Sequence, residues 1–106
     1  VYKTALNQFR PYLSLYDALK SFKFCIEKDF FQNDTFNILS GNFTVNQILR
    51  MIKKYKKKIK VKLVDAEIMN QLSYHVSKEK IEKEGLHLNH NIENDIKNTL
   101  KLLGNI

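Results

Sequence analysis

The segment from Phe9 to Ala18 constrains the fold of this chain more than any other. It contains the only proline, Pro11, within residues 10–15, where apolar and polar side chains alternate as in a β-strand. Because proline has no N–H to donate, we expect this strand to lie at the edge of a sheet or to begin there. Ser14 then offers a helix N-cap, with Asp17 in the first turn of the following helix. The segment therefore predicts a strand that leads directly into a helix.

The residues after Ser14 have the spacing of an amphipathic helix over 16–28. Apolar side chains recur at intervals of three and four, and we expect this face to pack on the core. It comprises Leu15, Ala18, Leu19, Phe22, Cys25 and Ile26. Cys25 is the only cysteine, which excludes an internal disulfide and suits a reducing, cytoplasmic compartment. Since no histidine or carboxylate pattern accompanies Cys25, we interpret it as a core residue rather than a nucleophile.

Capping residues and apolar spacing predict three further helices. The N-caps are Thr44, which forms a capping box with Gln47, Ser77 and Asn91. The second helix ends near residues 56–58, and the short third helix covers 78–84 and stops at Gly85. The apolar face of the last helix comprises Ile92, Ile96, Thr99, Leu100 and Leu103.

Two more segments have the composition of β-strands. Residues 35–40 are largely apolar, which is typical of a strand buried on both faces. Residues 59–65 alternate apolar side chains with lysines, which predicts a strand with one solvent-exposed face. The chain is thus expected to be an α/β fold with about three to four short strands and four helices. At 106 residues it is long enough for a single domain.

The net charge of +7 comes from one local segment. Residues 35–64 contain eight of the 18 basic residues and no acidic one, and the ten remaining basic residues face 11 acidic ones. The basic run from Lys53 to Lys62 has two interpretations: a solvated helix end, which we favour, or a surface for nucleic acid or a protein partner. No run of apolar residues approaches the length of a membrane span.

Local motifs do not identify a reaction. The three glycines are isolated, so neither a dinucleotide fingerprint nor a P-loop is present. The three histidines lack the partner spacing of a metal site, and no Ser/His/acid motif stands out. Tyr-x-x-x-Lys occurs as Tyr16…Lys20 and Tyr74…Lys78, a number of matches expected by chance among so many lysines. We therefore predict no catalytic and no metal-binding residue.

Several short blocks stand in a definite order along the chain. They are Arg10-Pro11-Tyr12 with Asp17-Ala18, Phe36-Asn37-Ile38-Leu39-Ser40-Gly41-Asn42-Phe43-Thr44-Val45, Tyr74, Lys80-Ile81 with Gly85-Leu86, and Ile92-Glu93 with Ile96 and Thr99. Together they resemble the C-terminal part of an extended short-chain dehydrogenase/reductase, of the NAD-dependent nucleotide-sugar epimerase/dehydratase family. The resemblance covers essentially all 106 residues and implies one substrate-binding domain, a C-terminal subdomain of a Rossmann-type reductase fold.

The resemblance also assigns substrate-binding residues. In the family, the arginine of the first block contacts the diphosphate of the nucleotide sugar, and this position is Arg10. The alternative is an ion pair between Arg10 and a local carboxylate such as Asp17. The tyrosine of the later loop lines the substrate pocket and corresponds to Tyr74, which is otherwise a core residue. Many members supply a second arginine from that loop, where this sequence has Asn70 and Gln71 instead.

The Gly-rich NAD motif and the catalytic residues of the family precede the part that this chain resembles. The resemblance therefore implies a parent isomerase or lyase with an N-terminal Rossmann domain, absent from this chain, that binds NAD. The chain alone is expected to bind no NAD and to catalyse nothing. Its expected partners are a nucleotide-diphosphate sugar and the missing domain, and an apolar face left uncovered is expected to promote homodimer formation.

Overall fold

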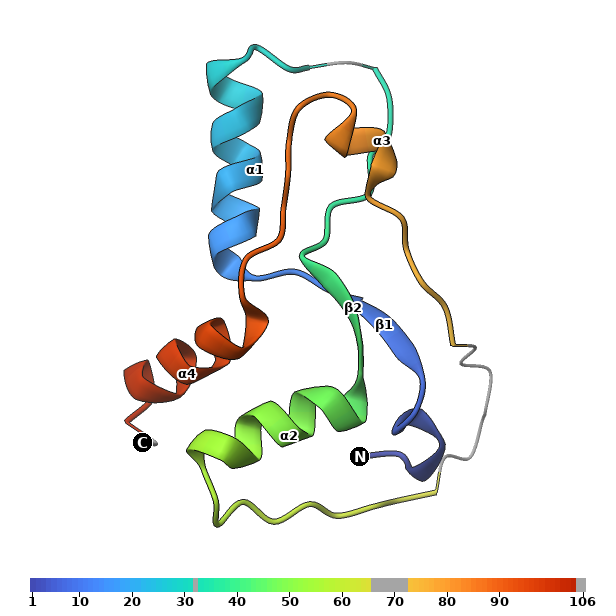
Figure 1. Ribbon diagram of the computed structural model, residues 1–106, viewed down its shortest axis with the longest axis vertical. Helices are drawn as coiled ribbons and strands as arrows, with labels where there is room; N and C mark the ends of the chain where they lie inside the picture. The colour runs from blue at the N-terminus through green and yellow to red at the C-terminus, as the bar shows by residue number, and fades with distance from the viewer. Residues whose placement is uncertain (32, 66–72, 105–106) are drawn as a thin grey trace.

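The computed structural model describes residues 1–31, 33–65 and 73–104. Within them, β1 (Phe9–Tyr12) and β2 (Gly41–Thr44) form an antiparallel sheet at the centre of the molecule (Figure 1). The helices are α1 (Leu15–Glu27), α2 (Val45–Tyr55), α3 (Glu79–Glu82) and α4 (Ile92–Leu102), and a 3-10 turn, η1 (Lys3–Ala5), precedes β1. In this view α1 and α3 lie above the sheet, α2 lies below it, and α4 lies to its left and contacts α2. The fold is mixed α/β, as predicted.

The strand around Pro11 is confirmed, but the sheet is smaller than expected. Instead of three to four strands, the described residues contain two, and Pro11 of β1 stands opposite Asn42 of β2. Residues 35–40 form no strand. Phe36 and Ile38 pack on the core cluster and Leu39 is buried, whereas Asn37 is exposed, so the segment is not buried on both faces throughout. Regular pairing starts at Gly41, directly after Ser40, whose N–H donates to the Tyr12 carbonyl at 2.8 Å.

The strand predicted over 59–65 is reduced to a single parallel bridge between Val64 and Tyr2. The N–H groups of Val64 and Lys3 donate to the carbonyls of Val1 and Val64, respectively. The N-terminal segment then turns into η1 at Lys3 and leaves this edge. Before Val64, the Lys62 carbonyl accepts from the amino group of Val1 at 2.9 Å, and no strand of the described residues pairs with residues 59–61.

The predicted N-caps Ser14, Thr44 and Asn91 are confirmed by their hydrogen bonds. The predicted N-cap Ser77 is wrong, because α3 begins at Glu79 and its N-cap is Lys78, which makes no side-chain capping bond. The Ser14 Oγ accepts from the Asp17 N–H at 2.9 Å. The Thr44 Oγ1 accepts from the Gln47 N–H at 3.1 Å, and the Gln47 side chain accepts from the Thr44 N–H at 2.7 Å. Helix α3 is shorter than predicted, and Gly85 follows it with a φ of +99°, a conformation that glycine adopts readily.

The hydrophobic core is small and lies between α1 and α3. Its buried centre consists of Ile81, Leu86 and Leu88, against which partly buried side chains pack. These are Phe24, Phe30, Phe36 and Ile38. Successive pairs of the three phenylalanine rings have centroids 5.2 and 5.3 Å apart, so aromatic packing supplies much of the core contact.

The apolar face of α1 points away from the core, contrary to the prediction. Asp17 and Phe24 face inward, whereas the stripe of four apolar residues on the opposite side is exposed by 61–76%. This stripe consists of Leu15, Leu19, Phe22 and Ile26. The rotation of the helix is set by Asp17, which is 1% exposed and bonded to two other segments, and by Phe24 in the aromatic cluster.

The prediction for α4 is partly wrong as well. Ile92 is buried, but Thr99 is exposed and Leu103 is 67% exposed. None of the helices in the part of the chain that the structure describes is long and apolar enough to cross a membrane.

Candidate functional site

The structure brings Arg10 and Tyr74 together beside the sheet, although they are far apart in the sequence. Residues 73–76 run along β1: the Phe9 N–H donates to the Ser73 Oγ at 3.0 Å, and the Phe9 carbonyl accepts from the Tyr74 N–H at 3.3 Å. The Cζ of Arg10 then lies 4.8 Å from the centroid of the Tyr74 ring. We call Phe9, Arg10, Tyr74 and His75 the Arg10 corner.

The guanidinium of Arg10 is held in a defined orientation. Its Nη1 donates to the Phe9 carbonyl at 2.7 Å, and its Nη2 donates to the Gln8 Oε1 at 3.1 Å. The face of the group packs against the Tyr74 ring in a cation–π contact. Arg10 as a residue is half-buried, and its guanidinium is a planar, permanently charged donor.

Two aromatic contacts lie at this part of β1, that of Tyr74 with Arg10 and that of His75 with Phe9. Tyr74 is 48% exposed, so it is not a core residue. The His75 ring is also exposed and lies 4.3 Å from the Phe9 ring, centroid to centroid. A guanidinium can bind phosphate oxygens, and an exposed aromatic ring can stack on a base or a sugar. Together the two groups suit a nucleotide.

Asn42 fixes the segment that carries Tyr74 and His75, a role that the sequence did not indicate. Its side-chain amide donates to the Val76 carbonyl and its Oδ1 accepts from the Val76 N–H, both at 3.0 Å. A side chain thereby takes the place of a strand neighbour. The other two predicted substrate-binding residues, Asn70 and Gln71, lie outside the described residues.

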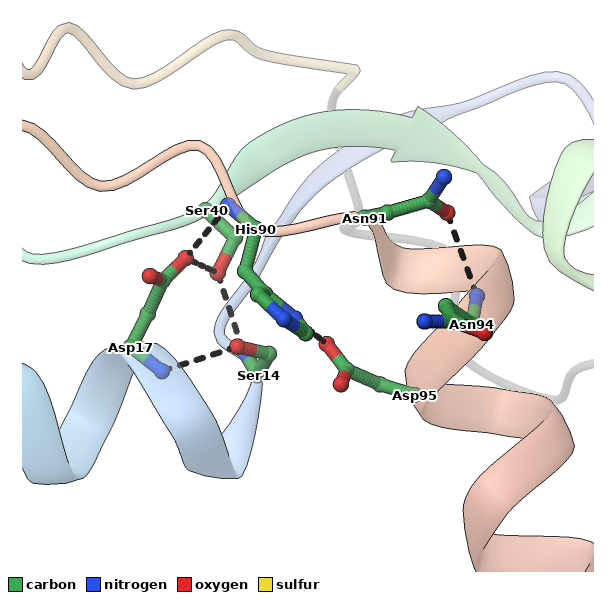
Figure 2. A network of polar contacts seen from close by, with 7 residues as sticks. All are labelled: Ser14, Asp17, Ser40, His90, Asn91, Asn94 and Asp95. Carbon is green, nitrogen blue, oxygen red and sulfur yellow. Dashed lines mark hydrogen bonds and ion pairs between the residues drawn. The ribbon is translucent and has the colours of Figure 1, made fainter.

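A second polar cluster surrounds Asp17 and joins three segments (Figure 2). The Asp17 Oδ2 accepts from the Ser40 Oγ and from the backbone N–H of His90, and the Ser40 Oγ in turn accepts from the Ser14 N–H at 2.9 Å. The buried Asp17 carboxylate is therefore bonded to Ser40 and to the backbone of His90, and not to Arg10, which was the alternative prediction. Neither role was predicted: Ser40 lies in the block of residues 36–45 without an assigned function, and His90 stands in no motif.

The Asp17 cluster does not have the geometry of a Ser-His-Asp triad. His90 contributes its backbone N–H to Asp17, while its Nδ1 is 2.7 Å from the Asp95 carboxylate. Its ring also stacks on Tyr16, with centroids 4.1 Å apart. The imidazole therefore does not bridge the serine and the aspartate, and the cluster holds α1, Ser40 and the start of α4 together.

Both Tyr-x-x-x-Lys pairs have structural contacts. Lys20 donates to the His87 carbonyl at 2.7 Å, and Tyr16 stacks on His90. Lys78 donates to the carbonyls of Ser40 and Leu88, which ties α3 to the strand end and to the core segment. Neither lysine is placed as the partner of its tyrosine.

The basic run begins on the last turn of α2. Lys54 lies 2.6 Å from Glu93, which also accepts from the Tyr55 hydroxyl at 3.1 Å. Two hydrogen bonds lower the pKa of Glu93, of which that from Lys54 has the larger effect and that from Tyr55 the smaller. The bond between Lys54 and Glu93 also raises the pKa of Lys54. Beyond the helix, the side chains of Lys57, Lys58, Lys60 and Lys62 are exposed.

No group of three or more metal-ligating side chains is found among the residues that the structure describes. A comparison of the chain with protein-family models, with curated proteins and with solved structures found no match. The resemblance to the epimerase/dehydratase family therefore stays a prediction.

Proposed function

We propose that this chain is the substrate-binding part of an NAD-dependent nucleotide-sugar epimerase or dehydratase and that Arg10 binds the diphosphate. The observation that supports this proposal most is the approach of Arg10 to Tyr74 at 4.8 Å. These are two of the four residues that the resemblance assigns to the substrate, and long-range backbone contacts hold them side by side.

In this proposal the residues of the corner have different roles. The Arg10 guanidinium donates to phosphate oxygens, in charge-assisted bonds that a fixed planar group makes with little loss of side-chain entropy. The exposed rings of Tyr74 and His75 offer stacking surface for the base or the sugar. Asn70 and Gln71 supply further polar groups in place of the family's second arginine.

The glycines do not fit a site for NAD in this chain. Gly41 is a β2 residue, whereas Gly85 and Gly104 follow helices with positive φ, and none starts a helix after a strand. The resemblance assigns NAD and the catalytic groups to a preceding domain. Binding without turnover is therefore the activity proposed for these 106 residues.

Calorimetric titration with a uridine-diphosphate sugar tests the proposal. We expect binding to the unchanged chain, and a loss of about tenfold or more in affinity for Arg10→Ala, since a charge-assisted hydrogen bond contributes about 1.5–3 kcal/mol. Arg50→Ala is the matched control, because it removes the other arginine from an exposed position on α2. Equal effects of the two substitutions would refute a specific role for Arg10.

The run from Lys53 to Lys62 supports a second candidate function, binding of nucleic acid or of an acidic protein partner. The exposed lysines of the run favour this function. The ion pair between Lys54 and Glu93 counts against it, because it neutralises one of the positive charges. Titration with a short duplex at two salt concentrations separates the candidates. Salt-sensitive duplex binding that Lys57→Ala/Lys58→Ala abolishes, without any nucleotide-sugar signal, would favour this alternative.

A further inference from the structure

The chain exposes more surface than a closed domain of its size. Its accessible surface is 7987 Å², whereas a folded monomer of 12.5 kDa exposes roughly 6,200 Å². The radius of gyration is 16.3 Å, against about 13 Å for a compact domain of this length. The excess, roughly 1,800 Å², is larger than the area of about 800 Å² that each partner buries in a standard interface.

Four exposed apolar side chains of this surface form the outer stripe of α1, namely Leu15, Leu19, Phe22 and Ile26. Successive members are four, three and four residues apart, which is the spacing of the seam between two helices in a coiled coil. The helix lies along one side of the molecule in Figure 1, with the core on its other side. The stripe is therefore accessible to a second helix along its whole length.

The stripe is complementary to itself when two copies run antiparallel. A two-fold axis between Leu19 and Phe22 places Leu15 of one copy opposite Ile26 of the other and Leu19 opposite Phe22. Antiparallel helices also oppose their dipoles.

The residues beside the stripe fit the same arrangement. On one flank, the antiparallel pairing sets Lys23 of each copy next to Tyr16 of the other, a cation beside an aromatic ring. On the other flank stand the small residues Ala18 and Cys25, which permit close approach. No two like charges face each other across the seam.

A groove extends the apolar surface beyond the start of α1. It has a volume of about 330 Å³, and its lining includes Leu15 itself together with Leu13, Ile52 and Ile96. Stripe and groove thus form one continuous surface that reaches from α1 to the side chains of α2 and α4.

We propose that the chain forms a two-fold symmetric homodimer through antiparallel packing of α1 on α1 of a second copy, with Leu15, Leu19, Phe22 and Ile26 as the seam. The dimer buries the apolar face that the fold of a single copy leaves in water. It does not depend on the Arg10 corner, which is built from β1 and residues 74–75, so the two proposals stand or fall separately.

Sedimentation velocity across a dilution series tests the dimer. We expect the unchanged chain to have twice its mass of 12.5 kDa, and Leu19→Lys/Phe22→Lys to be monomeric with the same circular dichroism spectrum. Leu102→Lys/Leu103→Lys is the matched control, because it charges two leucines that are equally exposed but lie outside the seam. This control is expected to remain dimeric.

The direction of packing is tested by disulfide trapping in a Cys25→Ser background. When chains with Leu19→Cys and chains with Phe22→Cys are mixed and oxidised, antiparallel packing predicts that disulfides between unlike chains predominate. A monomer at every concentration, a dimer that survives Leu19→Lys/Phe22→Lys, or crosslinks mainly between like chains would each overturn the proposal.

Discussion

Arg10 and Tyr74 show how far single residues of the site can be predicted from the sequence. Each was assigned by its place in a motif order, and the structure brings them into contact. The contact itself depends on the alignment of residues 73–76 with β1, which is secured by Ser73 and by the side chain of Asn42. The Asn42 side chain bonds residues 73–76 in the way that a neighbouring strand would. Such a contact produces no periodic pattern in the sequence, so the alignment of residues 73–76 could not be predicted.

Asp17 is expected to be the polar residue that contributes most to stability. It is almost fully buried and accepts hydrogen bonds from Ser40 and His90. Asp17→Ala leaves two buried donors without an acceptor, and we expect the free energy of unfolding in urea to fall by about 2–3 kcal/mol. The control Glu84→Ala removes an exposed carboxylate and should change stability by less than about 0.5 kcal/mol. Equal effects of the two substitutions would show that the Asp17 cluster is not structural.

Asp34 makes stability depend on pH. Its carboxylate accepts from Lys80 at 2.9 Å and from the Thr35 N–H at 2.8 Å. Both bonds lower the pKa of Asp34 below the ordinary 3.8, and the bond from Lys80 has the larger effect. The ionised form thus favours the folded chain above the unfolded pKa, and this contribution is lost as the pH falls through the folded pKa.

The expected result is a difference in unfolding free energy between the unchanged chain and Asp34→Asn that shrinks below about pH 4. Because the pair is exposed, added salt should reduce the same difference at neutral pH. Urea unfolding at several pH values and two salt concentrations measures both effects. A difference that stays constant over pH would contradict the assignment.

At the scale of elements, the starts of α1, α2 and α4 were predictable, whereas the start of α3 and the orientation of α1 were not. Ser14, Thr44 and Asn91 act within their own first turns, so local sequence suffices to identify them. The rotation of α1 depends instead on Ser40 and His90, which reach Asp17 from distant segments. An apolar stripe alone therefore indicates a helix without showing whether the core or another chain covers it.

The capping box of α2 provides a test at this scale. Thr44→Ala removes the acceptor of the Gln47 N–H at the start of an 11-residue helix, and we expect a loss of about 1 kcal/mol. Thr44→Ser retains the hydroxyl and serves as the control. Thermal unfolding followed by circular dichroism compares the variants, and equal melting temperatures for alanine and serine would contradict a role for the cap.

At the scale of the whole molecule, the α/β class was predictable from periodicity, whereas the number of strands was not. Residues 35–40 and 59–65 have strand composition, but a strand also needs a neighbour with which to pair. The first has no regular pairing before Gly41, and the second keeps only the bridge at Val64. The result is a two-stranded sheet and a small core, which leaves the outer face of α1 exposed.

The most direct test of the proposed function is an NMR titration of the chain with a uridine-diphosphate sugar. We predict that the resonances of Phe9, Arg10, Tyr74 and His75 shift together with increasing ligand, that Arg10→Ala removes these shifts, and that Arg50→Ala leaves them unchanged. Shifts confined to residues 53–62, or shifts at the Arg10 corner that persist in Arg10→Ala, would contradict diphosphate binding by Arg10.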